Sequence, residues 1–513
     1  MGVPRVGEES ITSPIFRVRG QRSRWRYLDD RITPEHCEVL RNVNISERGT
    51  AESRFGTTTY NPTQLAGGEV AVGLWQGTFA NGNTKQVVVT PTKVYDVTAS
   101  TKSAITGTAL TGGNDDRVRF EFLKDQLIFS NGVDTPRVWA GSSNTSNLAT
   151  VPWSKITDFM VHKNLMIAMG PTEGGTKYPT RIRWCDIDRV NFVVNLNTWR
   201  DTNRYEIYDG GPAIVGGVDN WGQALIFKED GLYPGEIFYD QLGHFDFRLG
   251  QRRRGFSPVS KMSIVARPEF VFGAAKEGIF VIRPDLSFDI VNTDDTDHWF
   301  ALNRGRLSLC QAFVRERDHQ VRLIVSSEGN TTGHNHELVW DWETGDIWVD
   351  LPSVKKSYAE TVDISGSEFD WFGGTDGYLY QGNNSSYQDD NGIGFTWRIK
   401  MHPNDLGLPG KKKHILNLRT YHRFREGSST ITVRCNVDQG RSELRSGAVT
   451  VGSGIEWDDT NNEWDTGLIW PGAEALIADF EVNRIAEVVA PEWEASNPAG
   501  IEGYQVEFIP LEN

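Results

Sequence analysis

Residues 263–291, SIVARPEFVFGAAKEGIFVIRPDLSFDIV, decide how this chain is expected to fold. Four short apolar runs lie in this stretch, at 264–266, 270–274, 279–283 and 288–291. The second and third runs are separated by Lys276-Glu277-Gly278, and a Glu-Gly pair supplies the positive φ that a tight hairpin turn requires. Four short antiparallel strands joined in this way make one blade of a β-propeller.

The same turn recurs along the chain. An acidic or amide residue and a glycine precede an apolar run at Asn131-Gly132, Asp230-Gly231, Glu277-Gly278 and Asp376-Gly377. Gly231 and Gly278 are 47 residues apart, whereas the intervals from Gly132 to Gly231 and from Gly278 to Gly377 are each 99 residues. Two intervals are thus close to twice the third. If the turn recurs at the shorter interval, further copies of it, here called repeat marks, are expected near Gly82, residue 181 and Gly329.

This spacing predicts blade-by-blade repetition, because a four-stranded blade needs about 40 to 50 residues. An Asp-Gly pair before an aromatic residue is common in any β protein, so the regular interval is what favours the repeat. We predict an all-β fold with a β-propeller over residues 66–402. Its blades number six or seven, since the first and last marks belong to one blade if both ends of the domain close it together.

The two flanking regions differ from the repeat. Residues 1–65 are rich in arginine and show little strand alternation, so they predict an extended arm that lies against the rest of the protein or a neighbour. Residues 403–513 contain strand-like runs at 415–421, 430–437, 475–480 and 503–508, together with a Trp-rich hairpin between Trp457 and Trp470. This density of strands predicts a β-sandwich domain.

Composition narrows the classes of function. The 513 residues carry a formal net charge of -15, which argues against a protein that coats DNA, because such binding relies on Lys and Arg. An acidic wall would instead let DNA pass without gripping it, although solubility alone also explains acidity. The four cysteines are far apart with no CxxC pair, which predicts a reducing folding environment. No apolar run suggests a signal peptide or membrane span.

Two polar clusters resemble metal sites. His334-Asn335-His336 places two imidazoles two residues apart, but a catalytic zinc ion needs three protein ligands, so a polar loop is the better interpretation. Residues 292–298 (NTDDTDH) offer three aspartates, but their spacing does not match a calcium-binding loop, so a solvated turn is favoured. We therefore predict no metal and no cofactor.

Carboxylates also lie beside tryptophans, as in glycoside hydrolases. Residues 340–346 (WDWETGD) and 458–467 (DDTNNEWDTG) show this pattern, yet both are explained as hairpins with an Asn, Asp and Gly turn. The basic runs at 252–254 and 411–413 are isolated within an acidic chain and are interpreted as solvated loops that could hold an acidic partner or a DNA phosphate. The chain lacks a GxSxG, P-loop or HExxH motif, and we predict no catalytic residue and no enzymatic activity.

Several short motifs resemble one family. Residues 40–45 (LRNVNI), followed by Arg54-Phe55-Gly56, resemble the opening of the tail nozzle proteins of short-tailed bacteriophages, also called tail tubular or packaged-DNA-stabilisation proteins. Further similarities are residues 130–139, which contain SNG and PRVW, and residues 255–258 (GFSP). The C-terminal Trp-Asp hairpin is also similar to that group.

The resemblance implies a structural virion protein, assembled in the host cytoplasm, that forms a hexameric ring below the portal and adaptor. Such a ring extends and closes the channel for DNA ejection, contacts adaptor and tail fibres, and lets double-stranded DNA pass without sequence-specific binding. It also implies that the arm, including Arg22, Arg24, Trp25 and Arg26, lies at a subunit or adaptor interface. The alternative is a propeller tail protein that binds or degrades polysaccharide.

Overall fold

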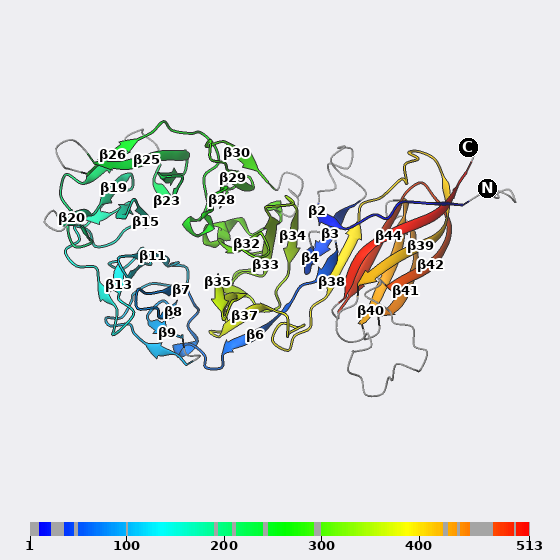
Figure 1. Cartoon of the computed structure of the whole chain (residues 1–513), viewed down its shortest axis with the longest axis horizontal. Coiled ribbons are helices and arrows are strands. Elements are labelled where there is room, and N and C mark those ends of the chain that lie inside the picture. Colours follow the sequence, from blue (N-terminus) through cyan, green and yellow to red (C-terminus); the bar gives the residue numbers. More distant parts are fainter. Residues whose placement is uncertain are drawn as a thin grey trace. The chain divides into compact units, whose positions relative to one another are not determined.

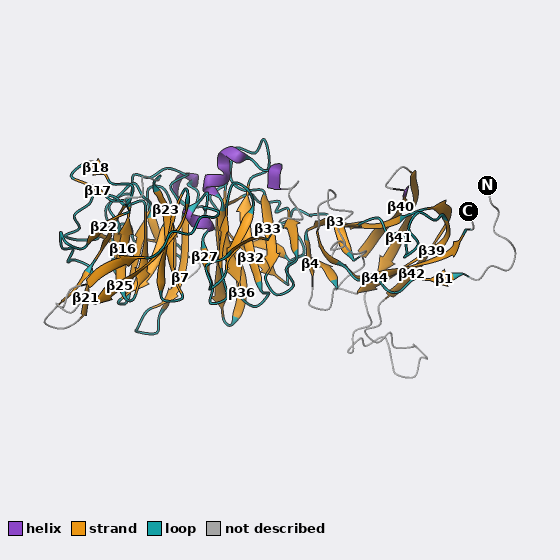
Figure 2. Cartoon of the chain, turned by 90° about the horizontal axis from the view of Figure 1, so that it is seen from above, coloured by secondary structure: helices purple, strands orange, loops and turns teal. Residues whose placement is uncertain are grey.

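The computed structural model describes residues 10–21, 35–45, 50–98, 101–188, 193–207, 212–239, 245–291, 299–423, 429–438, 442–451, 476–496 and 499–511. The chain divides into two compact units. The propeller unit consists of Thr57–Glu337 and Val354–Asn384, and the sandwich unit consists of Met1–Gly56, Leu338–Ser353 and Ser385–Asn513. Strands dominate both units, while helical elements such as η3 (Lys261–Ser263) and η4 (Arg304–Leu309) are short (Figure 2).

The propeller unit is built from four-stranded antiparallel sheets, most of which follow the chain order. The first is β7 (Gly73–Thr78), β8 (Thr84–Val89), β9 (Val94–Asp96) and β10 (Ser103–Ala104). The second is β11 (Arg119–Leu123), β12 (Gln126–Ser130), β13 (Arg137–Trp139) and β14 (Ser146–Asn147). The third is β15 (Asp158–His162), β16 (Leu165–Met169), β19 (Arg181–Trp184) and β22 (Arg204–Glu206).

The remaining sheets repeat this plan. They are β23 (Ile214–Asn220), β24 (Gln223–Lys228), β25 (Gly231–Tyr239) and β26 (Phe245–Leu249), then β27 (Val265–Ala266), β28 (Val271–Ala274), β29 (Ile279–Ile282) and β30 (Phe288–Ile290). A further run is β31 (Gln311–Arg315), β32 (Gln320–Val325), β33 (His336–Asp341) and β34 (Ile347–Asp350). In this run, β34 and the part of β33 from Leu338 onward belong to the sandwich unit. Figure 1 shows the sheets around a central axis, with β11 and β23 nearer the centre than β13 and β26. The prediction of a β-propeller is confirmed.

The last sheet joins both ends of the propeller unit. Its order is β35 (Lys356–Ile364), β36 (Ser367–Gly374), β37 (Leu379–Asn384) and β6 (Gly56–Asn61). The fourth strand therefore comes from before the first sheet, and the other three come from the end of the unit. This is the joint closure that the first and last repeat marks suggested.

Most repeat marks lie where strand two turns into strand three. This holds for the glycines between β12 and β13, β24 and β25, β28 and β29, β32 and β33, and β36 and β37, namely Gly132, Gly231, Gly278, Gly329 and Gly377. The mark near Gly82 was placed wrongly, because Gly82 joins the first and second strands of its sheet. Gly377 has φ 80° and a Cβ there would lie 2.9 Å from the backbone of Gly68, so the turn requires glycine.

The sandwich unit contains two facing sets of strands. One has the order β4 (Val43–Ile45), β5 (Ala51–Ser53), β44 (Gly500–Pro510), β39 (Lys413–Arg423) and β42 (Leu476–Ala486), with β1 (Ile11–Thr12) beside β44. The other has the order β34, β3 (His36–Arg41), β38 (Trp397–Met401), β43 (Val489–Ala495), β40 (Ser429–Val437) and β41 (Ser442–Val451), with β2 (Arg19–Gln21) beside β3. Apolar side chains of both sets, including Leu40, Trp397, Leu418 and Trp493, form one buried core.

This division differs from the predicted boundaries of 1–65, 66–402 and 403–513. The described part of the N-terminal segment supplies β3, β4 and β5 to the sandwich and β6 to a propeller sheet. The sandwich also takes β34 and β38 from before residue 403. The cause is visible in the burial of Leu40 and Val43, which are fully inaccessible and complete the sandwich core.

Candidate functional site

Of the two clusters that resemble metal sites in the sequence, only the histidine cluster lies within the described residues. His334 is buried, its Nδ1 lies 3.2 Å from the Ser326 hydroxyl, and burial lowers its pKa to about 3. Asn335 bonds to the backbone N–H and the hydroxyl of Ser327, which makes this segment a polar loop leading into β33. Residues 292–298 lie outside the described residues. Within the described ranges, no group of His, Cys, Asp or Glu has the arrangement of a metal site.

Residues 340–346 form the hairpin turn between β33 and β34. The Asp341 carboxylate accepts the backbone N–H groups of Glu343 at 2.9 Å and Thr344 at 3.0 Å. Gly345 has φ 75°, which suits the tight turn between β33 and β34. The turn thus accounts for Asp341 without a substrate. The second segment of this kind, 458–467, lies outside the described residues.

One residue of each basic run is bound within the protein, whereas Lys411 and Lys412 are exposed. Arg252 forms an ion pair with Asp230 at 2.6 Å, and the Lys413 ammonium donates to three backbone carbonyls, those of Leu408, Lys411 and Glu487. Arg22, Arg24, Trp25 and Arg26 lie outside the part of the chain that the structure describes, so their placement at an interface remains a prediction.

The cysteines are not candidate nucleophiles. Cys37, Cys185, Cys310 and Cys435 are buried free thiols. Burial raises the pKa of Cys185, Cys310 and Cys435 to about 12 each, and that of Cys37 is also raised. The thiol form therefore prevails at neutral pH, whereas nucleophilic attack requires the thiolate. Among the described helices, none is long and apolar enough to cross a membrane.

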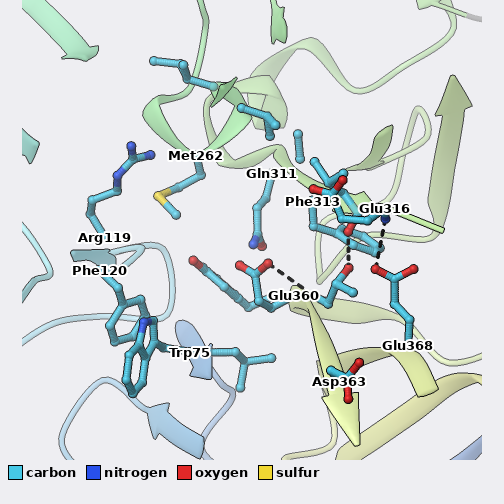
Figure 3. A pocket seen from close by; sticks show the side chains of 17 residues that line it. Trp75, Arg119, Phe120, Met262, Gln311, Phe313, Glu316, Glu360, Asp363 and Glu368 are labelled. Carbon is cyan, nitrogen blue, oxygen red and sulfur yellow. Dashed lines mark hydrogen bonds between the residues drawn. The ribbon is translucent and has the colours of Figure 1, made fainter. Parts of the chain in front are cut away.

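The candidate site is a cavity of about 510 Å³ within the propeller unit. It is lined mainly by the first strands of several sheets, β7, β11, β31 and β35, with η3 and β27 between them. Alternate residues of a strand face the same side, which places Arg119 and Glu121 together on β11 and Tyr358 and Glu360 together on β35. Figure 3 shows Glu360 and Gln311 in the middle of the view, between Arg119 with Phe120 and Glu316 with Glu368.

Arg119 is the basic group of the cavity wall. Its Nη2 lies 3.4 Å from the carbonyl oxygen of Gly217 and 3.7 Å from Oε1 of Glu121. Burial raises the pKa of Glu121 to about 7, although the nearby guanidinium opposes this rise.

Glu360 is the second carboxyl group with a raised pKa. Burial raises it to about 7, against the opposing effects of the Thr361 N–H, which donates to Glu360 at 3.2 Å, and of Arg119. The other acidic groups of the wall are already engaged. Glu368 accepts the backbone N–H groups of Glu316 at 2.9 Å and Arg317 at 3.1 Å, and Glu316 forms an ion pair with Arg267.

The cavity residues were not singled out from the sequence. Arg119, Phe120, Glu121 and Phe122 alternate as in any half-buried strand, and Glu360 lies within an ordinary strand sequence. These residues could be predicted only by combining two signals: charged residues at alternate positions of a strand, and the place of that strand at the start of a repeat unit. In a propeller, such a strand faces the axis rather than solvent.

We predict that Glu360→Gln removes part of the pH dependence of stability. A carboxyl group whose pKa is raised in the folded state binds its proton more tightly than in the unfolded chain, so it lowers stability as the pH rises from about 4.5 to 7. The variant should match the wild-type unfolding midpoint at pH near 5 and exceed it near 8, in thermal unfolding at the two pH values. Glu277→Gln, at an exposed turn, should leave this difference unchanged.

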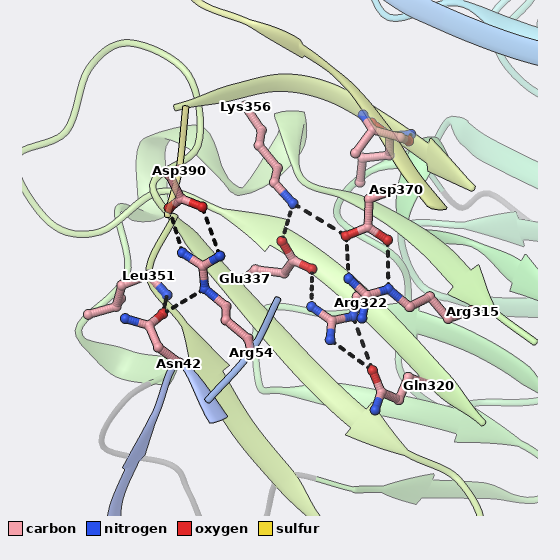
Figure 4. Close-up of polar contacts among 12 residues, drawn as sticks. Asn42, Arg54, Arg315, Gln320, Arg322, Glu337, Leu351, Lys356, Asp370 and Asp390 are labelled. Carbon is pink, nitrogen blue, oxygen red and sulfur yellow. Dashed lines mark hydrogen bonds and ion pairs between the residues drawn. The ribbon is translucent and has the colours of Figure 1, made fainter. Parts of the chain in front are cut away.

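A buried network of charged side chains lies between β31, β32, β33, β35 and β36 (Figure 4). Glu337 is its central anion: Arg322 contacts it at 2.7 Å, and the Lys356 ammonium also pairs with it. Arg315 forms a two-bonded pair with Asp370, which lies 4.0 Å from Lys356. The side chains of Arg322 and Glu337 are each 2% exposed, so the network lies within the packed interior.

A second buried cluster lies in the sandwich unit and contains residues that carry the family resemblance (Figure 4). Arg54 bonds to both oxygens of Asp390, at 2.9 and 2.5 Å, and its Nε donates to the Asn42 side chain at 3.2 Å. The same Asn42 oxygen accepts the backbone N–H of Leu351 at 2.7 Å. The guanidinium also lies 3.9 Å from the ring centroid of Phe395. We call these five residues the Arg54 clasp.

No family model and no curated protein matches the sequence. Among solved structures, the WD40 domain of Pan2 from Neurospora crassa is similar at 9% identity with a TM-score of 0.40, over 66% of this chain and 98% of that domain.

Proposed function

We propose that this protein is a structural tail nozzle protein of a short-tailed bacteriophage, a ring component that extends and closes the DNA channel below portal and adaptor. The observation that carries the proposal is the Arg54 clasp. Asn42 and Arg54, which carry the resemblance, are buried and join the N-terminal strands to the rest of the sandwich. Gly56 belongs to the same motif, and a Cβ there would lie 2.3 Å from the Asp389 carbonyl oxygen.

The position of these residues gives the resemblance structural weight. Side chains that determine how a segment enters a fold constrain architecture, whereas exposed turn residues do not. A motif shared at such positions therefore supports a shared architecture, including the way the N-terminal segment is folded into the sandwich. In the proposed ring, six copies with a net charge of -15 each would surround the channel with negative potential and let DNA slide past.

The proposal is tested by imaging and weighing the purified protein. Negative-stain images and mass measurement should give closed rings of six copies with a central hole, either alone at high concentration or after addition of the adaptor. A protein that stays monomeric at every concentration and also ignores the adaptor would contradict the proposal.

We predict that replacing Arg22, Arg24 and Arg26 together by alanine prevents ring or adaptor assembly while leaving the fold intact. The resemblance places these residues at an interface, where loss of three positive charges weakens contact with an acidic neighbour. An interface position implies that these side chains are exposed in the free protein, so thermal unfolding should change little, because surface substitutions usually alter stability by less than about 0.5 kcal/mol. Lys411→Ala with Lys412→Ala, at exposed positions, is the control and should assemble normally. Normal assembly of the triple variant would contradict the prediction that these arginines lie at the interface.

A further inference from the structure

We propose that the axial cavity of the propeller unit binds a neutral saccharide, with the apolar face of a pyranose ring against Trp75 and Phe120 and its hydroxyl groups bonded to Arg119 and Glu360. This inference is independent of the ring-forming role. It rests on the size of the cavity, the fixed aromatic wall, the unused polar atoms and the mixture of charges.

The size of the cavity suits a small ligand. Its volume of about 510 Å³ falls within the range of roughly 300 to 1,000 Å³ that is typical of small-molecule sites. Such sites combine apolar and aromatic walls with a few polar groups that orient the ligand. Here Trp75, Phe120 and Phe313 supply the aromatic wall, and Arg119, Gln311 and Glu360 supply the polar groups.

The aromatic wall is held in place before any ligand binds. The Trp75 ring is stacked on Phe122, with centroids 5.8 Å apart and planes inclined by 20°. On β7 itself, a Cβ at Gly77 would lie 2.1 Å from the Trp75 ring, so the ring occupies the space that any larger residue would fill. A rigid aromatic surface contributes contact area at little cost in conformational entropy, and it suits the C–H face of a sugar ring.

Two polar groups of the wall retain bonding capacity. Arg119 has five N–H donors, and its contacts within the described residues both involve Nη2, a hydrogen bond to Gly217 at 3.4 Å and an ion pair with Glu121 at 3.7 Å, which leaves its other donors unused there. Glu360 accepts one backbone N–H, from Thr361, and no other hydrogen bond reaches it from the described part of the chain. The Gln311 amide, in contrast, is used at both ends by the backbone of Ala359. Arg119 and Glu360 are therefore the groups that can bond to a ligand.

The mixture of charges selects a neutral ligand. The Arg119 guanidinium disfavours a cation beside it, while the carboxyl groups Glu316, Glu360, Asp363 and Glu368 disfavour an anion. Of these four, Glu316, Asp363 and Glu368 already have partners within the protein. A hydroxyl group both donates and accepts, so it can accept from Arg119 and donate to Glu360 at once. A ligand that carries many hydroxyl groups on an apolar ring satisfies the whole wall, and a neutral pyranose is such a ligand.

The test is a titration of the full-length protein with methyl glycosides of glucose, galactose, mannose and N-acetylglucosamine, followed by saturation-transfer NMR and calorimetry. Glucuronate and glucosamine serve as the anionic and cationic probes. At least one neutral glycoside should bind, and it should bind more tightly than either charged probe. Trp75→Ala and Arg119→Lys should each weaken this binding roughly tenfold.

Two further variants separate binding from folding. Glu360→Gln keeps the shape of the side chain and replaces an acceptor by an amide, so it should weaken binding while the protein remains folded. Trp221→Ala removes a half-buried tryptophan at the turn between β23 and β24, away from the lining, and should bind as the wild type does. The proposal is overturned if no neutral glycoside binds at millimolar concentration, if a charged probe binds more tightly, or if binding survives in the Trp75, Arg119 and Glu360 variants.

Discussion

Replacing Glu337 by glutamine is expected to lower the free energy of unfolding of the propeller unit by about 3 to 5 kcal/mol. Glu337 is the shared partner of Arg322 and Lys356, and all three side chains are at most 6% exposed. The neutral amide leaves two cations buried without their anion, and the loss of attraction is not recovered by hydration. Urea unfolding of the full chain, followed by tryptophan fluorescence, measures the loss.

The charge balance of the network gives a sharper comparison. The network holds the cations Arg315, Arg322 and Lys356 and the anions Asp370 and Glu337. Lys356→Met removes the surplus cation and leaves Arg322 paired with Glu337 and Arg315 paired with Asp370, so it should cost less than Glu337→Gln. An equal or larger loss for Lys356→Met would contradict this account.

The matched control is an exposed ion pair of the same unit. Arg283 and Asp289 are 2.7 Å apart with side chains 64% and 51% exposed, so Asp289→Asn should cost less than about 1 kcal/mol. Acid provides a second readout. The cations hold the pKa of Glu337 far below its usual value of 4.5, so its stabilisation is complete above that pH and is lost as the pH falls further. The variant should lack this component of acid unfolding.

Replacing Arg54 by methionine is expected to destabilise the sandwich unit by a similar amount, about 3 to 5 kcal/mol. The Asp390 side chain is 1% exposed, and without Arg54 its carboxylate retains Ser353, whose N–H donates at 2.8 Å and whose hydroxyl also bonds to it, but no cation among the described residues. Asn42 loses the same partner. Hydrogen exchange should show faster opening of β4 and β5, because these strands lie beside the clasp in sequence.

The control for this substitution is Arg419→Met. Arg419 pairs with Asp479 at 2.7 Å on the same unit, but the two side chains are 46% and 51% exposed. Its loss should change the free energy of unfolding far less than loss of Arg54 does, because solvent screens an exposed pair, and it should leave exchange in β4 and β5 unchanged. If Arg54→Met behaves like Arg419→Met, the clasp does not hold the N-terminal strands.

The propeller could be predicted because its signals are local. In residues 263–291, the expected strands at 270–274, 279–283 and 288–291 correspond to β28, β29 and β30 within one or two residues. The geometry of each hairpin there is determined by the few residues between its strands, so a short stretch of sequence is enough to predict it. The interval between such hairpins then predicted the repeat.

The composition of the sandwich could not be predicted in the same way. β3 pairs with β38 and β34, which lie hundreds of residues later in the chain. No local pattern in residues 36–41 predicts this pairing. An arginine-rich segment with one short apolar run was interpreted as an arm, yet Leu40 and Val43 are fully buried. Pairing between distant strands is decided by the whole core, which a linear pattern does not display.

The cavity was also beyond a sequence pattern. Arg119 and Glu360 lie on strands whose alternation indicates a polar face, and polar faces usually meet solvent. Only the closure of the sheets around an axis turns those faces inward and raises the pKa of Glu121 and Glu360. The fold had to be known before these residues could be recognised.

The use of β6 as the fourth strand beside β37 governs the order of events during biosynthesis. At about 5 to 20 residues per second, a ribosome needs on the order of tens of seconds to pass from Asn61 to Leu379, and β6 has no partner during that time. The nascent chain must therefore carry an open edge until its final propeller sheet emerges, and a chaperone that shields this edge would raise the yield. Early termination anywhere before residue 379 would release a propeller whose last sheet lacks β37, so that β6 could not pair.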